Sequence, residues 1–244
     1  MTTATLVLQE YVIPSLGGAI SVLVFISSVP ALYKARKRKD LGEINPIPFV
    51  GILGNTVCQV IYAIISDSNP YLFFPNFVGL LISSWLTIIA YGIVKREKLK
   101  LFMEILLELE LLVAGLSAFI ASKITDFSVR KTFYGIVCIV ILCLFYFSPL
   151  TTLYEVIKKK DASTLSTPLT VTLTVNCCLW LSYGFYLADR AIYIPNVLGL
   201  LFCVIQIIAI LLYKRKNRPS SIFKKEVSGK DPENIDLRFN YIYI

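Results

Sequence analysis

The sequence predicts an all-α membrane protein whose seven transmembrane helices form two parallel three-helix bundles joined by a linker helix, a 3+1+3 arrangement. Three observations lead to this prediction. Apolar runs near the roughly 20 residues that cross a bilayer recur along nearly the whole chain, which is 56% hydrophobic with a mean hydropathy of +0.71. Basic residues gather in short clusters between alternate runs. The first part of the chain is also repeated by the last part.

The apolar runs predict the spans, and the charges between them predict an orientation. The spans cover residues 12–33, 44–66, 70–94, 101–122, 132–156, 167–187 and 191–213. Basic clusters follow the odd-numbered spans, at residues 34–39, 95–100, 158–160 and 214–218. Because basic loops stay in the cytosol, we expect the N-terminus outside and the C-terminus inside. The first span has no basic segment before it, so we expect it to remain as a signal-anchor.

The internal repeat divides the chain into parts. Matched segments stand 121 residues apart before the third span and 120 residues apart from Pro75 onward. The matches are residues 37–40 with 158–161, Asn55 with Asn176, Tyr62 with Tyr183, and 75–81 with 195–201. We therefore expect a first repeat over residues 10–95, a linker helix over 99–123, a second repeat over 131–214 and a disordered cytosolic tail over 217–244.

Composition excludes several classes of function. The chain has no histidine, and its six cysteines all lie inside apolar runs without a C-x-x-C motif, so we expect no metal or redox site and treat them as small buried residues. No nucleophile–base pair and no phosphate-binding glycine loop is present, so we expect neither enzyme activity nor a cofactor. The net charge of +8 lies in clusters that fit membrane topology, so we expect no nucleic-acid partner.

Two asparagines in matched positions are the candidate centre of the protein. Asn76 and Asn196 each follow a proline inside an apolar span, where an unpaired amide is costly and must face a partner helix or water. One interpretation is that they hold helices together. The other is that two uncharged amides converge on a neutral hydroxylated solute.

Further polar and aromatic residues share these spans. Trp180 lies three residues before Tyr183, and the matched position in the first half is Gln59. An indole face can stack on a sugar ring while a glutamine binds its hydroxyls, although a Trp packed between helices explains the same pattern. Asn55 and Asn176, one turn earlier, are expected to line the same site.

The prolines suggest hinges, and the acids leave open whether transport is coupled to an ion. Four prolines lie toward the expected cytosolic ends of spans one, two, five and six, where each is expected to free a carbonyl and permit a kink: Pro30, Pro48, Pro149 and Pro168. The repeats hold almost no acids, which favours passive transport. The linker holds Glu104, which is expected to pair with Lys100, together with Glu108 and Glu110. Glu110 either snorkels or pairs within a tilted span, or takes part in ion coupling.

Over about residues 10–215 the sequence resembles the SWEET sugar-transporter family in its eukaryotic, two-repeat form. The most specific signals are the repeated P-N-x-x-G-L-L, the N-C-C-L-W-L-S-Y-G run from Asn176 and the K-K-K-D loop. The resemblance implies that Asn76 and Asn196 are the substrate-binding pair, flanked by Trp180 and by Gln59. It also implies a homotrimer.

The resemblance assigns other roles and shows one departure. It implies that Val24 and Phe145 bear on substrate size, with the bulky Phe145 favouring a monosaccharide, and that Tyr62 and Asp189 form an outer gate. Of the family's four gate prolines, Pro48 and Pro149 match. Serines stand at the other two positions, with the nearest prolines displaced by two residues: Ser28 with Pro30, and Ser166 with Pro168.

The sequence thus predicts a bidirectional sugar uniporter that works by alternating access. A proton-coupled transporter of an amino acid or similar solute, as in the related PQ-loop proteins, is an alternative, and a seven-helix receptor is another. The expected partners are a sugar and the lipid bilayer. The plasma membrane is the expected location, with the Golgi and vacuolar membranes as alternatives.

Overall fold

The computed structural model describes residues 3–42, 44–67, 69–145, 153–154, 156–162 and 165–213, and side chains of residues 143–145 are not among those described. The elements are α1 (Thr3–Val7), the π-helix η1 (Leu8–Val12), α2 (Ile13–Ser27), α3 (Val29–Arg38), α4 (Ile47–Ile65), α5 (Pro70–Ile93), α6 (Glu97–Lys123), α7 (Phe127–Phe145), α9 (Thr167–Tyr186) and α10 (Arg190–Leu212). Residues 156–159 are also helical. Five predicted spans agree closely with α4, α5, α6, α9 and α10, whereas the first is part of one helical stretch from Thr3 to Arg38. The fifth, predicted over 132–156, begins earlier, at Phe127, and part of its predicted second half lies outside the described residues.

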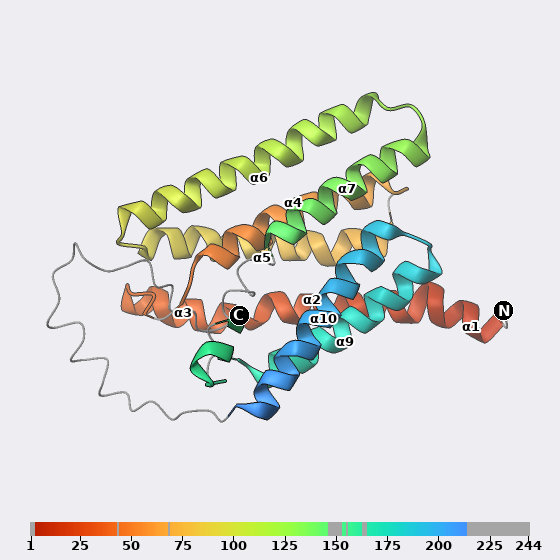
Figure 1. Cartoon of the computed structure of the whole chain (residues 1–244). Coiled ribbons are helices and arrows are strands. Elements are labelled where there is room, and N and C mark those ends of the chain that lie inside the picture. Colours follow the sequence, from red (N-terminus) through yellow and green to blue (C-terminus); the bar gives the residue numbers. More distant parts are fainter. Residues whose placement is uncertain are drawn as a thin grey trace, which may run out of the picture.

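Both repeats pack their helices in the same order. In the first repeat, α5 lies between α2 and α4, and in the second, α10 lies between α7 and α9. Across the two repeats α2 packs on α9 and α4 packs on α7, so each first helix meets the other repeat's second helix. Figure 1 shows these helices running along one long axis, with α6 lying outside them against α4 and α7. The fold is therefore the all-α membrane arrangement that the sequence predicts.

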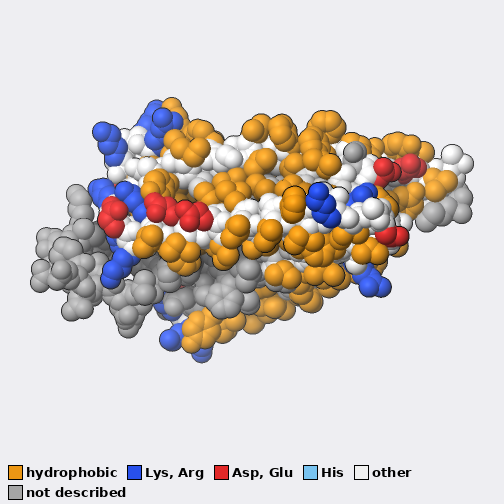
Figure 2. Space-filling view, turned by 90° about the horizontal axis from the view of Figure 1, so that it is seen from above, with side chains coloured by type: hydrophobic (Ala, Val, Ile, Leu, Met, Phe, Trp, Pro, Cys, Tyr) orange, Lys and Arg blue, Asp and Glu red, His pale blue; other side chains and the backbone are white. Residues whose placement is uncertain are grey.

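The surface is that of a chain surrounded by lipid. Five stretches of the described residues are long and apolar enough to cross a bilayer: Thr3–Arg38, Ile47–Ile65, Pro70–Ile93, Glu97–Lys123 and Arg190–Leu212. The second helix of the second repeat, α9, is less apolar because it carries four threonines. Figure 2 shows hydrophobic side chains covering most of one face, with basic side chains gathered mainly at one end. That end, which carries the Lys37-Arg38-Lys39 cluster, is called the basic end below.

The backbone repeats its turns as well as its helices. Lys39 and Lys160, which are matched in the repeat, both adopt left-handed conformations, with φ values of 55° and 49°. The residue after each donates its N–H five residues back, Asp40 to Ala35 and Asp161 to Val156, both at 3.2 Å. This hydrogen bond ends a helix at a left-handed residue. The match between residues 37–40 and 158–161 in the sequence is therefore a repeated helix-ending turn.

The prolines differ from expectation. Pro48 and Pro168 lie in the first turn of α4 and α9, where no helical N–H bond is lost, so the kink expected at these two positions is wrong. Pro30 does interrupt a span, because α2 ends at Ser27 and α3 begins at Val29. Pro149 lies outside the described residues, as does the tail over 217–244.

The cysteines are mostly buried, as expected, with one exception. The thiols of Cys58, Cys138, Cys177 and Cys203 are buried and free, whereas Cys178 is exposed on the surface of α9. The expectation of burial is therefore wrong for Cys178, because adjacent helical residues face different sides.

Candidate functional site

Asn76 and Asn196 occupy equivalent places in α5 and α10. Each helix opens on a residue that caps it, Asn69 for α5 and Asp189 for α10. Each candidate amide follows its cap by seven residues, which places both about 10 Å along their helices. The proline just before each amide has no N–H for the carbonyl four residues back, so the backbone is locally interrupted at equal depth in both helices.

The two amides also make the same hydrogen bond. The side-chain nitrogen of Asn76 donates to the Leu72 carbonyl at 2.8 Å, and that of Asn196 donates to the Ile192 carbonyl at 2.7 Å. Both residues are half-buried, and among the described residues neither amide oxygen has a hydrogen-bond partner. The oxygens are acceptors, so what they lack is a donor such as a hydroxyl group.

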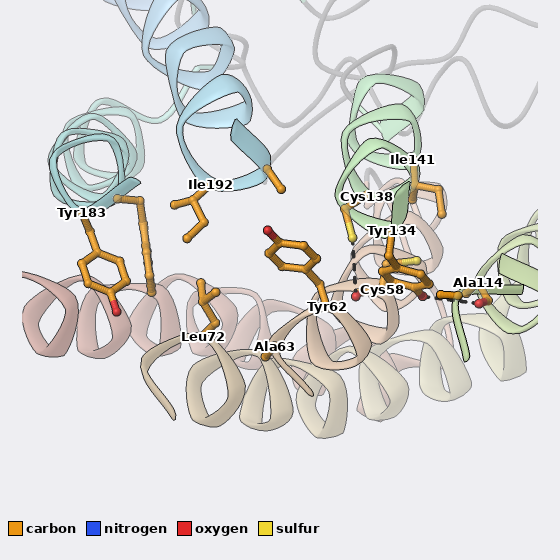
Figure 3. Packing of buried hydrophobic residues seen from close by; sticks show 13 residues of the cluster. Cys58, Tyr62, Ala63, Leu72, Ala114, Tyr134, Cys138, Ile141, Tyr183 and Ile192 are labelled. Carbon is orange, nitrogen blue, oxygen red and sulfur yellow. Dashed lines mark hydrogen bonds between the residues drawn. The ribbon is translucent and has the colours of Figure 1, made fainter. Parts of the chain in front are cut away.

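The two residues whose carbonyls accept from the amides belong to one apolar cluster. Leu72 and Ile192 are buried in the same cluster as Tyr62 and Tyr183, and Figure 3 shows the Leu72 and Ile192 side chains pointing toward one another. Asn76 and Asn196 therefore each lie one helical turn beyond this shared cluster, on the side toward the basic end.

Trp180 of α9 is held by α2 of the other repeat. Its indole N–H donates to the Ser21 hydroxyl at 3.0 Å, and that hydroxyl donates to the Asn176 amide oxygen at 3.0 Å. Gly17 gives the ring its space, since a Cβ at this position would lie 3.3 Å from the indole. With 7% of its surface exposed, Trp180 is in this conformation a packed residue at the junction of the repeats.

The second repeat lacks the matching serine. The counterpart of Ser21 at the same offset is Leu142, and the Asn55 amide oxygen is buried without a hydrogen-bond partner in the described part of the chain. Gln59 and Val24 are half-buried. The side chain of Phe145 lies outside the described residues.

Tyr62 and Asp189 are in direct contact at the other end of the bundles. The Tyr62 hydroxyl lies 2.7 and 2.8 Å from the two carboxylate oxygens of Asp189, which is only 5% exposed. Lys131 of α7 forms an ion pair with the same carboxylate at 2.8 Å. The carboxylate also accepts the N–H of Ala191 at 3.0 Å, so one side chain caps α10 and joins it to α4 and α7.

A matching contact joins the repeats with the roles exchanged: here the second repeat supplies the tyrosine and the first repeat supplies the helix cap. The amide nitrogen of Asn69 donates to the Tyr183 hydroxyl at 2.9 Å, while its oxygen caps α5 by accepting from Tyr71 at 3.0 Å. Each tyrosine thus reaches the residue that caps the third helix of the other repeat, and Figure 3 shows Tyr62 and Tyr183 within the cluster that lies between the repeats. We call this region the tyrosine end.

The acids of α6 are arranged differently from expectation. Lys100 pairs with Glu97 at 3.3 Å rather than with Glu104, which instead accepts a hydrogen bond from the Tyr91 hydroxyl. Glu110 neither snorkels nor pairs within the described part of the chain, because one of its carboxyl oxygens is fully buried and has no partner there. The expected pairings of Glu104 and Glu110 are therefore wrong.

Several contact residues were missed by sequence reasoning. Asn69 could have been found, because it matches Asp189 at the offset of 120. The sequence identified Lys131 only as a charge in a loop. It gave no reason to select Ser21, because the partners of this residue lie on α9, more than 150 residues away.

The chain matches the family model described as "Sugar efflux transporter for intercellular exchange" over residues 12–99 and 132–218. These two segments correspond to the two repeats, and the linker lies between them.

Curated relatives cover most of the chain. It is 31% identical over 210 residues to the bidirectional sugar transporter NEC1 of Petunia hybrida, covering 86% of this chain and 78% of that protein. It is 27% identical over 216 residues to the bidirectional sugar transporter SWEET13 of Oryza sativa subsp. japonica, covering 88% and 72%. A solved structure of a eukaryotic SWEET transporter superposes with a TM-score of 0.74 at 20% identity, covering 83% of this chain and 95% of that one.

Proposed function

Because this chain belongs to the SWEET family of sugar transporters, we propose that it is a bidirectional sugar uniporter with its substrate site between Asn76 and Asn196. Its relatives are named bidirectional sugar transporters, and they are transporters rather than enzymes. The observation that carries the proposal is the matched pair of amides, which keep the same backbone bond and present two oxygens without described donors.

The chemistry of the pair suits a neutral polyol. Each amide nitrogen is already engaged with a carbonyl, so the oxygens are oriented before a ligand arrives and lose little freedom on binding. Sugar hydroxyls can donate to both oxygens without bringing a charge into the membrane. In this proposal Trp180, Gln59, Asn55, Asn176, Val24 and Phe145 complete the site, and a monosaccharide is the favoured substrate.

Alternating access is the proposed mechanism. Parallel repeats related by an axis along the membrane normal are an established transporter architecture, of which SWEET proteins are themselves an example. The contacts at the tyrosine end support a gate there, which must break for the site to open on that side. Opening toward the basic end is proposed to involve Pro30, which lies where α2 ends and α3 begins.

Finer points of the proposal rest on charge and on the family. The basic end is placed in the cytosol, which puts the tyrosine end and the N-terminus outside. The plasma membrane is the proposed location. A homo-oligomer, a trimer by family resemblance, is the proposed assembly.

Loss of either amide is expected to abolish transport. In liposomes containing the purified protein, Asn76→Ala and Asn196→Ala should each reduce exchange of labelled glucose to the rate of empty liposomes, because one half of the proposed site is removed. Ser84→Ala is the matched control: Ser84 lies on the same helix and makes the same kind of bond, to the Leu80 carbonyl at 2.7 Å.

The outcome that contradicts the site is wild-type exchange by either asparagine variant. The same assay separates a carrier from a receptor, since a receptor would move no labelled sugar in the wild-type protein. Running it with glucose and with sucrose tests the preference for a monosaccharide.

A further inference from the structure

Glu110 lies at the middle of the linker helix and points into the protein. Thirteen residues separate it from each end of α6, Glu97 and Lys123, or about 20 Å of helix on either side. A carboxyl group at the centre of a membrane span is costly and is retained where it has a function.

The carboxyl group occupies a notch in α4. Gly54 makes the notch, because a Cβ at this position would collide with the carboxyl group of Glu110. In the second repeat the matched residue is Val175, which is 45% exposed on the surface of α9. The notch is therefore specific to the repeat that the linker covers.

No cation among the described residues compensates this carboxyl group. Neither α4 nor α5 carries a charged residue, and the basic residues of α7 are engaged elsewhere, Lys131 with Asp189 and Arg130 with the Ile124 carbonyl. The titratable groups that face this region are the Cys58 thiol, one turn beyond Gly54, and the Tyr134 hydroxyl, which donates to the Ala114 carbonyl of α6 at 3.3 Å. Figure 3 shows Cys58, Tyr134 and Ala114 close together.

On α6 itself the neighbouring acids face other surroundings. Glu104 accepts from Tyr91, and Glu108 is exposed. With one oxygen buried and no cation beside it, the Glu110 carboxyl is stable in the notch only as the neutral acid.

We propose that Glu110 is a proton-binding positioning residue, whose neutral carboxyl seats α4 against the linker and whose ionisation withdraws it from the notch and slows transport. The proposal rests on the proposed function, because Glu110 affects sugar transport only through the position of α4. Gly54 and Cys58 face the linker, whereas Tyr62 on the same helix reaches Asp189 of the second repeat. One turn from Glu110, the Tyr134 contact ties the linker to the second repeat as well. The proton is exchanged with water and is not carried across the membrane.

Glucose exchange in liposomes at equal pH on both sides tests the proposal. As the pH rises from mildly acidic to alkaline, wild-type exchange is expected to fall, approaching about tenfold per pH unit once the carboxyl is mostly ionised. Glu110→Gln, which mimics the neutral acid, should show no such fall. Glu108→Gln, two residues away and exposed, should keep the wild-type profile. Identical profiles for wild type and Glu110→Gln would overturn the proposal.

Two further measurements keep the proposal separate from the proposed function. If an imposed pH gradient drives uphill sugar accumulation in the wild type but not in Glu110→Gln, the residue couples proton transport and the positioning role is wrong. The thermal midpoint in detergent needs no sugar flux. Because an ionised carboxylate in the notch would be an unpaired buried charge, the wild-type midpoint should fall as pH rises, and the Glu110→Gln midpoint should fall less. Equal falls would overturn the proposal even if no sugar were transported.

Discussion

Tyr62 and Tyr183 occupy matched positions but meet partners of different charge. Tyr62 binds the buried carboxylate of Asp189, which Lys131 also contacts, whereas Tyr183 accepts from the neutral amide of Asn69. Hydrogen bonds to ionised groups are stronger than those between neutral groups. The two contacts therefore hold the tyrosine end unequally, and Tyr62–Asp189 is the stronger.

This inequality predicts a difference between two conservative substitutions. Tyr62→Phe should destabilise the protein by about 2 kcal/mol and Tyr183→Phe by about 1 kcal/mol, because each loses one hydroxyl contact and keeps its ring. The measurement is the thermal midpoint of the purified protein in detergent. An equal or larger effect of Tyr183→Phe would contradict the assignment of Asp189 as the stronger partner.

At the residue scale the sequence reveals what is repeated or charged. Asn76 and Asn196 stand out because a polar amide recurs in an apolar segment, whereas Asp189 is singled out by the resemblance to the family. Ser21 could not be inferred, since a serine in a membrane helix is ordinary until its partners on α9 are known. The sequence singles out Glu110 as an acid inside a span, but it does not reveal the site that holds the side chain, which depends on a glycine of another helix.

Among the elements, α2 touches both repeats through two adjacent glycines. A Cβ on Gly18 would lie 2.8 Å from the Pro75 ring of α5, and a Cβ on Gly17 would lie 3.3 Å from Trp180 of α9. Adjacent helical residues point about 100° apart, so one small pair lets α2 approach two helices at once. Through Pro75 this contact adjoins Asn76 itself.

A methyl group at Gly18 should therefore force α2 away from α5. Gly18→Ala is expected to cost about 1–3 kcal/mol, because the proline ring is rigid and overpacking is not relieved by a rotamer change. Gly92→Ala is the control, since a Cβ there meets nothing within 4 Å. Thermal midpoints in detergent compare the two, and similar stability for both variants would contradict the close approach of α2 and α5.

Helix positions could be predicted more completely than helix interruptions. Five stretches of the described residues are apolar and long enough to cross the bilayer, and each corresponds to a span predicted from an apolar run, since the bilayer imposes that length. The prolines were harder to interpret because the same residue opens a helix in its first turn and breaks it elsewhere. Whether Pro48 and Pro168 begin a helix depends on where the chain turns before them, which hydropathy does not define.

For the whole molecule, the main feature is a near-symmetric pair of bundles with one asymmetric addition. The helix order, the left-handed turns at Lys39 and Lys160 and the amide pair are all duplicated. The linker α6 belongs to neither repeat, and it packs on α4 and α7. Two similar bundles can rock against each other, so that one end of the molecule opens as the other closes, with little change inside either bundle. This is the motion that alternating access requires.

The most direct test of this account measures both ends of the molecule at once. Spin labels at matched exposed positions report the tyrosine end, through Pro70→Cys with Arg190→Cys, and the basic end, through Lys37→Cys with Lys158→Cys, in a background with the native cysteines replaced. Adding Tyr62→Phe weakens the tyrosine end alone. If the repeats move as rigid units around the amide pair, this substitution lengthens the first distance and shortens the second. A change confined to the tyrosine end, or a lengthening at both ends, would contradict the account.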